Sequence, residues 1–315
     1  MALSKFLDLK LDLTFKKIFG TKKNKNILIH FLNDILGFTE VNTIQELEFL
    51  STIMDPEIAS DKQSIIDVLC RDSSGSRYVI EMQLVRDRGF EKRAKLYAAK
   101  AYSRQADKSG QYIDLKKIFF IAVSNCNFFP EEVNYISTHN IRDIKTNGHY
   151  LKDFQFVFIE LPKFTKNRVE QLESTVERWY FFFKYAEDTT EKDLKKIAKK
   201  APIIKLTYDE LDKFSRNEKD LIAYEERVMG LQKEEAILEY KLDLAIEKGK
   251  REGMAKGIEE GRKEGRKESR EKSKRKAKIA AAKNLLKAGI SINIIAETIG
   301  LSVDEIKKLH EMEVN

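Results

Sequence analysis

Two acidic residues, Asp67 and Glu81, each lie inside a short apolar run of the sequence. Asp67 belongs to SIIDVLCR, Glu81 belongs to RYVIEMQL, and the residues DSSGS connect the two runs. Apolar runs on either side of turn-forming residues predict an antiparallel β-hairpin. An ionised carboxylate among apolar neighbours is costly unless it is paired or bound to a metal, so both acids are candidates for chemistry.

Side-chain alternation along the two predicted strands brings these carboxylates together. A Mg²⁺ ion takes one or two carboxylates together with waters and phosphate oxygens, and it can activate water and stabilise the leaving oxygen of a phosphodiester. The alternative is structural, because either carboxylate could pair with Arg93 or with a nearby lysine. The strand faces that carry the acids would consist of Ile65, Asp67 and Leu69, and of Val79, Glu81 and Gln83.

The rest of the first half predicts the elements that hold this hairpin. Apolar spacing predicts helices over residues 12–36 and 90–108. Strands are expected over residues 41–50, 117–123 and 154–161. This order predicts an α/β or α+β fold with a central mixed sheet flanked by helices.

An all-helical region is expected to follow this part. Nearly everything after Pro202 has a helical pattern, and residues 166–244 form an amphipathic, charged helical region. Its aromatic cluster at residues 179–185 is predicted to be core or a domain interface rather than a ligand site.

Residues 245–278 are of low complexity and strongly basic. Residues 247–278 contain 14 Lys/Arg and 7 Asp/Glu, a surplus equal to the net charge of +7 of the whole chain. Two interpretations stay open: a helix whose small residues allow a second helix to approach closely, and a flexible, solvated linker. In both, the basic side chains would neutralise phosphates. Glycine recurs at Gly249, Gly253, Gly257, Gly261 and Gly265, and the candidate DNA-binding residues are Arg262, Lys263, Arg266, Lys267, Arg270, Lys274, Arg275 and Lys276.

The last segment, residues 279–315, predicts three short helices in a helix-turn-helix-like unit. Gly289 would end the first helix and Ser291 would cap the second. Ser302 with Glu305 three residues later predicts a capping box for the third. These C-terminal helices are also the expected route to a homo-oligomer.

Composition excludes several classes of protein. The two cysteines, Cys70 and Cys126, sit in apolar runs and are expected to be buried, reduced thiols, and no closely spaced Cys/His cluster suggests zinc. The first residues lack the long apolar run of a signal peptide, and no stretch has the ~18 uncharged apolar residues of a membrane span. A cytoplasmic protein without a membrane partner is expected.

Taken together, the motifs resemble the recombination-promoting nuclease family of PD-(D/E)XK transposases. IIDVLCRDSSGSRYVIEMQL is similar to the core motif of that family, DLTFKKIFG with ILIHFLNDILG is similar to its opening, and DPEIASDKQSIID is similar to its lead-in. RAKLYAAKAYSRQADKSGQY resembles the helix after the motif. The resemblance covers roughly residues 8–165. It implies a restriction-endonuclease-like core in a domain of residues 1–165.

The resemblance also implies roles for individual residues. Asp67 and Glu81 would be the metal ligands, with the backbone carbonyl of Met82 as a third. Gln83 stands where the wider class has lysine; it carries no charge, so it could only orient the attacking water. The metal would then have to supply most of the activation; alternatively, a lysine or arginine from elsewhere, such as Lys62 or Arg93, would supply positive charge near the transition state. The auxiliary candidates are Asp12, whose alternative is a helix cap, and Lys62, Arg93, Tyr97 and Gln105, of which the last two could also simply pack.

The expected function is Mg²⁺-dependent endonucleolytic cleavage of DNA. A role in recombination or transposition follows from the resemblance alone. The rival interpretation is a catalytically inert DNA-binding or oligomerising protein on a nuclease fold.

Overall fold

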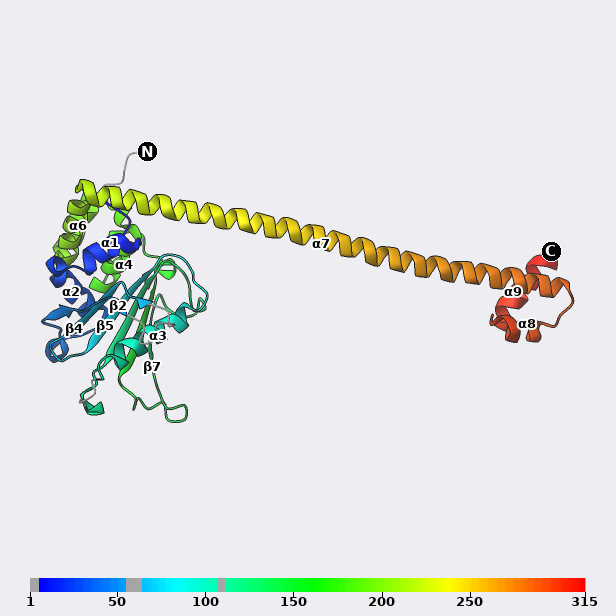
Figure 1. Cartoon of the computed structure of the whole chain (residues 1–315), viewed down its shortest axis with the longest axis horizontal. Coiled ribbons are helices and arrows are strands. Elements are labelled where there is room, and N and C mark those ends of the chain that lie inside the picture. The colour runs from blue at the N-terminus through cyan, green and yellow to red at the C-terminus, as the bar shows by residue number, and fades with distance from the viewer. Residues whose placement is uncertain (1–5, 55–63, 107–110, 315) are drawn as a thin grey trace. The chain divides into compact units, whose positions relative to one another are not determined.

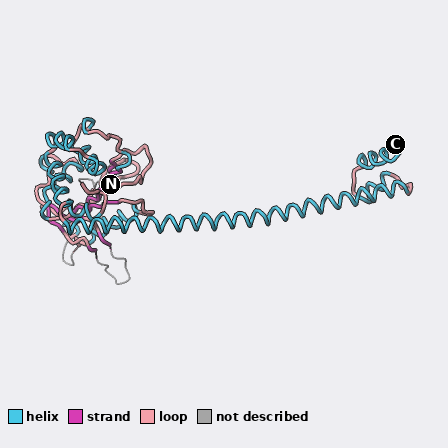
Figure 2. The backbone as a smooth tube through the Cα atoms, turned by 90° about the horizontal axis from the view of Figure 1, so that it is seen from above, coloured by secondary structure: helices cyan, strands magenta, loops and turns pink. Residues whose placement is uncertain are grey.

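A computed structural model describes residues 6–54, 64–106 and 111–314 of the chain. It divides into two compact units, Met1–Gly230 and Leu231–Asn315. Among the described residues, all strands lie in the first unit, as Figure 2 shows in magenta. None of the described helices combines the length and the apolar character that a membrane-crossing segment needs.

A six-stranded mixed sheet forms the centre of the first unit, with the order β1-β4-β5-β6-β8-β7. The pairs β5–β6 and β6–β8 are parallel, and the other neighbours are antiparallel. A separate two-stranded ribbon joins β2 to β3. The strands are β1 (Leu47–Phe49), β2 (Ile53–Met54), β3 (Ser64–Ile65), β4 (Val68–Asp72), β5 (Arg77–Gln83), β6 (Ile118–Ser124), β7 (Ile136–Asn140) and β8 (Phe154–Glu160).

Helices cover both faces of the sheet, as Figure 1 shows for the labelled elements. One face packs against helices α1 (Asp12–Phe19), α2 (Lys25–Leu36), α4 (Thr175–Tyr185) and α6 (Pro202–Ser215), through a core that contains Tyr78, Ile80 and Met82 of β5. The other face packs against α3 (Phe90–Ser103) through a core that contains Val79. Successive residues of β5 thus alternate between two cores, as the pleat requires. The mixed, helix-flanked sheet confirms the expected fold class.

The aromatic run of α4 belongs to the first core, as predicted. Trp179, Phe182 and Phe183 are fully buried, and Phe183 stacks on Phe19 of α1 with ring centroids 5.5 Å apart. Trp179 donates its indole N–H to Asp34 Oδ2 of α2 at 2.7 Å. Helix α1 is therefore positioned by aromatic packing against α2 and α4.

Three expectations about the strands and helices need correction. The strand over residues 41–50 shrinks to β1, because the Asn33 side chain bonds both backbone groups of Ile44 (2.8 and 3.0 Å) and replaces a neighbouring strand there. The first hairpin strand breaks at Ile66 and Asp67, since Ile65 pairs with β2 and not with β5. Helix α3 ends at Ser103, and residues 107–110 lie outside the described part.

Helix α7 (Glu218–Lys287) carries the basic, glycine-rich segment, so that segment is a helix rather than a flexible linker. A side-chain atom added at any of its five repeated glycines would meet nothing within 4 Å. Within the described chain, therefore, no second helix approaches this stripe. Helix α5 (Glu191–Lys200) comes directly before α6 in the chain.

The C-terminal unit packs the end of α7 against α8 (Ile292–Ile299) and α9 (Val303–Val314) through Ala282, Ile295 and Ile306. Gly289 ends α7 with φ 78°, so the first of the three expected short helices is the end of a 70-residue helix. Ser291 precedes α8 but makes no side-chain cap. The capping box is confirmed: Glu305 N–H donates to Ser302 Oγ at 3.3 Å and Ser302 N–H donates to Glu305 Oε2 at 3.0 Å.

Candidate active site

Asp67 and Glu81 lie side by side at the point where the β4–β5 ladder ends. The last antiparallel pair is Val68 with Ile80, so Asp67 stands across from Glu81. Asp67 N–H donates to Glu81 Oε1 at 3.2 Å, and Met82 N–H donates to Asp67 Oδ2 at 2.8 Å. Each carboxylate thus accepts from a backbone N–H of the other segment, in place of a backbone carbonyl. This reciprocal hydrogen bonding fixes both side chains.

Burial and mutual repulsion make this pair electrostatically costly. Glu81 is buried, and the desolvation of its carboxyl together with the charge of Asp67 raises the pKa of Glu81 to about 8. The charges of Arg93 and Lys16 act in the opposite direction and compensate only partly. A further cation at this point would therefore be stabilised by the field of the pair.

The donor set fits a hard divalent cation. Among the described residues, Glu81 Oε2 accepts no hydrogen bond, and Met82 directs its N–H toward Asp67. Because the N–H and C=O of a strand residue point to the same side, the Met82 carbonyl also faces the Asp67 side. The described side chains contain no group of three or more His, Cys, Asp or Glu residues that could hold a metal. A cation here would take two carboxylates plus backbone and water oxygens, which suits Mg²⁺.

Gln83 and Arg93 form one hydrogen-bonded unit beside the carboxylates. Arg93 of α3 donates from Nη2 to Gln83 Oε1 at 2.5 Å and from Nη1 to Asp87 Oδ2 at 2.8 Å. The Gln83 amide donates to the Val85 carbonyl. Arg93 also lies over the Phe90 ring, 4.9 Å from its centroid. Gln83 is therefore held in one orientation, and the Arg93 guanidinium that holds it is also bonded to Asp87.

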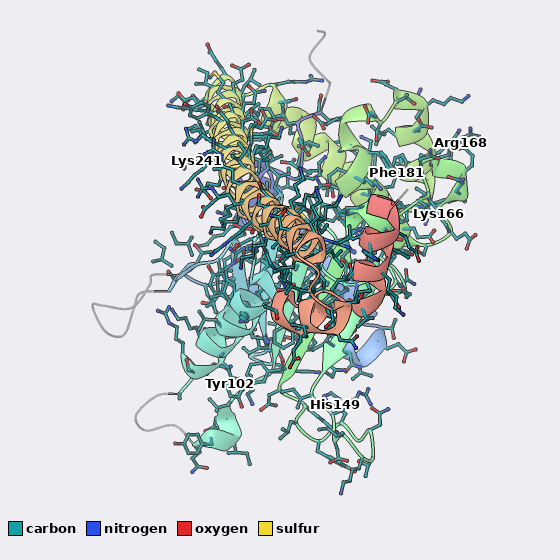
Figure 3. The ribbon with its side chains drawn as sticks, turned by 90° about the vertical axis from the view of Figure 1, so that its right-hand side faces the viewer. Tyr102, His149, Lys166, Arg168, Phe181 and Lys241 are labelled. Atoms are coloured by element: carbon teal, nitrogen blue, oxygen red, sulfur yellow. The ribbon has the colours of Figure 1, made fainter. Side chains whose placement is uncertain are left out.

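Helix α3 also places Tyr97 near the acids. Burial raises the pKa of Tyr97, and the charge of Glu81 raises it further. The far end of the helix is anchored where Tyr102, labelled in Figure 3, donates its hydroxyl to Asp153 Oδ2 at 2.6 Å. Tyr97 thus lies near enough to the carboxylates for their charge to act on its hydroxyl.

Gln105, the other auxiliary candidate expected on this helix, does not join the site. It lies beyond the end of α3, and its amide bonds both backbone groups of Lys116 (2.9 and 3.0 Å). Lys116 precedes β6 at the end of the sheet where Arg77 pairs with Ile118, whereas Gln83 pairs with Ser124 at the other end. Gln105 is therefore a loop anchor.

Asp12 is near the site but is bonded elsewhere. It is the first residue of α1 and not its cap, because the cap position is Leu11 and no side chain caps the helix. Its Oδ1 accepts from Nε of Arg227, in the first part of α7, at 3.1 Å. Lys62 lies outside the described residues.

Lys16 is the residue that the sequence pattern did not single out. Its Nζ lies 2.9 Å from Asp67 Oδ1. Burial alone would lower the pKa of Lys16, but Asp67 beside it, together with Asp12 and Glu81, raises it, so the amine stays charged. The only sequence clue is the spacing of four residues from Asp12, which places both on one side of α1.

The two cysteines are free thiols in the first unit, and the expected DNA-binding residues lie in the second. Cys70 is buried, whereas Cys126 is half-buried and not fully buried as expected, and both are free thiols. All eight candidate DNA-binding residues lie exposed on α7, where Lys263 pairs with Glu259 at 2.7 Å and Arg275 with Glu305 at 2.9 Å. None of the eight belongs to the unit that holds the acids.

Comparison with known proteins gives one match. The family model of the PD-(D/E)XK nuclease family transposases matches residues 9–241. No curated protein and no solved structure matches the chain. The matched range contains Asp67, Glu81 and Gln83.

The raised pKa of Glu81 gives a pH-dependent prediction for stability. Between about pH 4.5 and 8 the unfolded chain ionises this carboxyl while the folded protein keeps it protonated, so the free energy of unfolding falls as the pH rises. Glutamine is neutral throughout. The metal-free Glu81→Gln variant is expected to be more stable than the wild type at pH 8, by on the order of 2 kcal/mol, and to lose most of that advantage at pH 5.

Denaturant unfolding in the presence of a chelator, at both pH values, measures this difference. Glu48→Gln is a matched control, because Glu48 is an exposed strand residue paired with Arg71. Equal stability of the wild type and Glu81→Gln at pH 8 would show that the carboxylate pair is not strained.

Proposed function

This chain belongs to the PD-(D/E)XK nuclease family transposases, and from that premise we propose that it hydrolyses DNA phosphodiester bonds with a divalent cation held by Asp67 and Glu81. The observation that carries the proposal is the reciprocal hydrogen bonding that places these two carboxylates together. A structural ion pair would not need two adjacent acids, one of them with a pKa near 8. A cation site explains why the chain accepts this cost.

The reaction is a displacement at phosphorus. The oxygen of a water molecule forms the new bond to phosphorus, the bond from phosphorus to the leaving sugar oxygen breaks, and the proton lost by water is balanced by one gained by that oxygen. When bound, Mg²⁺ would supply Lewis-acid stabilisation of the phosphate oxygens and activation of the attacking water. Asp67 and Glu81 would position that cation, and Met82 would add its carbonyl.

Gln83 would orient the attacking water. Its amide can donate and accept but cannot take a proton at neutral pH. Arg93 and the Val85 carbonyl hold that amide at both ends. The fixed orientation suits a positioning role, and it leaves the activation of water to the cation.

The rival function is a DNA-binding protein with an inert site. It is distinguished from the nuclease by the dependence of cleavage on the carboxylates. Both acids are hydrogen-bonded, Glu81 is buried and Asp67 is largely buried, which favours the nuclease, because a site without a bound cation gains nothing from placing two acids together.

Asp67→Asn and Glu81→Gln are expected to slow cleavage of supercoiled plasmid in Mg²⁺ by at least about 10³-fold, since each removes a ligand charge while nearly preserving shape. Binding of the same DNA in Ca²⁺ or chelator should survive. Gel assays of nicking and band-shift assays measure the two properties, and Glu48→Gln is the control. Cleavage at the wild-type rate by both variants would favour the inert binding protein.

The basic segment of α7 is proposed to anchor the protein on DNA. Nine exposed Lys/Arg side chains lie on α7 between residues 262 and 276: the eight candidate residues and Lys272. Neutralised phosphates release counterions, which gives affinity without sequence preference.

Replacing all nine Lys/Arg of residues 262–276 by glutamine should weaken DNA binding and flatten its salt dependence, because each lost phosphate contact lowers the slope of log affinity against log salt by about 0.9. Cleavage at low salt and high enzyme concentration should persist, since the acids are untouched. Fluorescence anisotropy over a salt series measures the slope. An unchanged affinity and slope would assign the segment to spacing or assembly.

The remaining parts of the proposal concern assembly and context. Exposed apolar side chains on α7, among them Leu238, Leu242 and Ile246, give its first part a surface on which a second copy could pack. We propose a homo-oligomer through α7 and the C-terminal helices, and a role in recombination or transposition in the cytoplasm, where free thiols persist.

A further inference from the structure

In this chain the last position of the PD-(D/E)XK motif, a lysine in the motif's name, holds no charged residue. Gln83 occupies that position, and glutamine cannot offset the negative charge that develops on the phosphate during displacement. Among the described residues, two cations lie beside the acids: Arg93 on α3 and Lys16 on α1.

Arg93 is committed to other groups. Its Nη1 and Nη2 donate to Asp87 and Gln83, and its guanidinium lies over the Phe90 ring. Turning its guanidinium toward a phosphate would disturb the contacts that orient Gln83, and its Nε, which has no partner among the described residues, is buried. Arg93 is therefore a positioning residue for Gln83.

Lys16, unlike Arg93, has hydrogen-bond donors to spare. Its ammonium has three donors, and within the described chain the one ion pair is with Asp67 Oδ1 at 2.9 Å. Its side chain is 37% exposed, whereas that of Asp67 is 11% exposed. Lys16 is thus the more solvent-accessible partner of the ion pair, and its ammonium has donors beyond the one that Asp67 accepts.

The position of Lys16 is set by the fold rather than by the ion pair alone. Phe15 and Phe19 on the buried side of α1 pack against Phe183 of α4. The adjacent Lys17 points elsewhere and pairs with Asp220 at 2.8 Å. One lysine of the KK pair is therefore directed to the acids and the other to α7.

We infer that Lys16 supplies from α1 the positive charge that Gln83 lacks, by contacting a non-bridging oxygen of the scissile phosphate. The inference rests on the proposed nuclease function. Lys16 transfers no proton in this role; its ammonium donates a hydrogen bond and offsets charge as the displacement proceeds. Before the phosphate arrives, the same ammonium offsets part of the charge of Asp67.

The pair Lys16→Met and Lys17→Met tests the inference, because both variants remove one lysine charge from the same helix. At saturating Mg²⁺ and saturating DNA, Lys16→Met is expected to lower kcat by about 10²–10³-fold with KM for DNA within a few-fold of the wild type. Lys17→Met is expected to keep the wild-type kcat. Lys16→Arg should retain part of the rate.

Chemical rescue separates contact with the phosphate from a purely structural role. Lys16→Ala should regain part of its rate when ethylammonium is added, whereas Asp67→Asn should not. The half-saturating Mg²⁺ concentration should not rise in Lys16→Met, because a lysine on a ligand oxygen competes with the cation.

Two results would overturn the inference. Full kcat for Lys16→Met would do so, and so would a loss that ethylammonium does not restore and that accompanies weaker Mg²⁺ use. If the wild type cuts DNA and Asp67→Asn does not, either result removes the role of Lys16 alone. A wild type that does not cut DNA removes the proposed function and this inference with it.

Discussion

Two acidic side chains and two backbone N–H groups satisfy one another where the β4–β5 ladder stops. Asp67 accepts from Met82, and Glu81 accepts from Asp67. A buried backbone N–H without a partner costs about 1–3 kcal/mol. The carboxylates therefore satisfy the backbone at the end of the β4–β5 ladder as well as forming the site. The strand break at Asp67 is what allows this exchange, since a continued ladder would use the same backbone groups for pairing.

The surrounding elements of the first unit hold the end of this ladder in place. The parallel strands β5 and β6 end together at the pair Gln83 and Ser124, beside the two acids. Helix α3 brings Arg93 to Gln83 on one side, and aromatic packing against α4 holds α1, with Lys16, on the other. The two acids are thus surrounded by cations from two helices that the hydrophobic cores hold in place. These cations offset only part of the cost of ionising both acids, so the pKa of Glu81 stays raised.

Local patterns predict the hairpin, β6, β8 and the pair of acids. They do not predict β7 or the β2–β3 ribbon, and they fail where contacts between distant segments decide. The hairpin, β6, β8 and the alternation of β5 follow from periodicity, so Glu81 and Gln83 were placed correctly beside each other in the strand. The strand over residues 41–50 failed because the Asn33 side chain takes over its hydrogen bonds, and Gln105 failed because a loop after α3 uses its amide. Lys16 was missed because KK in an amphipathic helix resembles a solvated face. Only the packing of α1 shows which lysine meets Asp67.

Calorimetric titration of the metal-free protein with Mg²⁺ or Mn²⁺ at pH 7 tests most directly whether Asp67 and Glu81 share a divalent cation. Because the pKa of Glu81 is about 8 before the cation binds, binding should release about one proton per cation. Titrations in two buffers with different ionisation enthalpies measure that number, and Glu81→Gln should release none. Binding without proton release by the wild type, or no binding to the folded protein, would contradict the account.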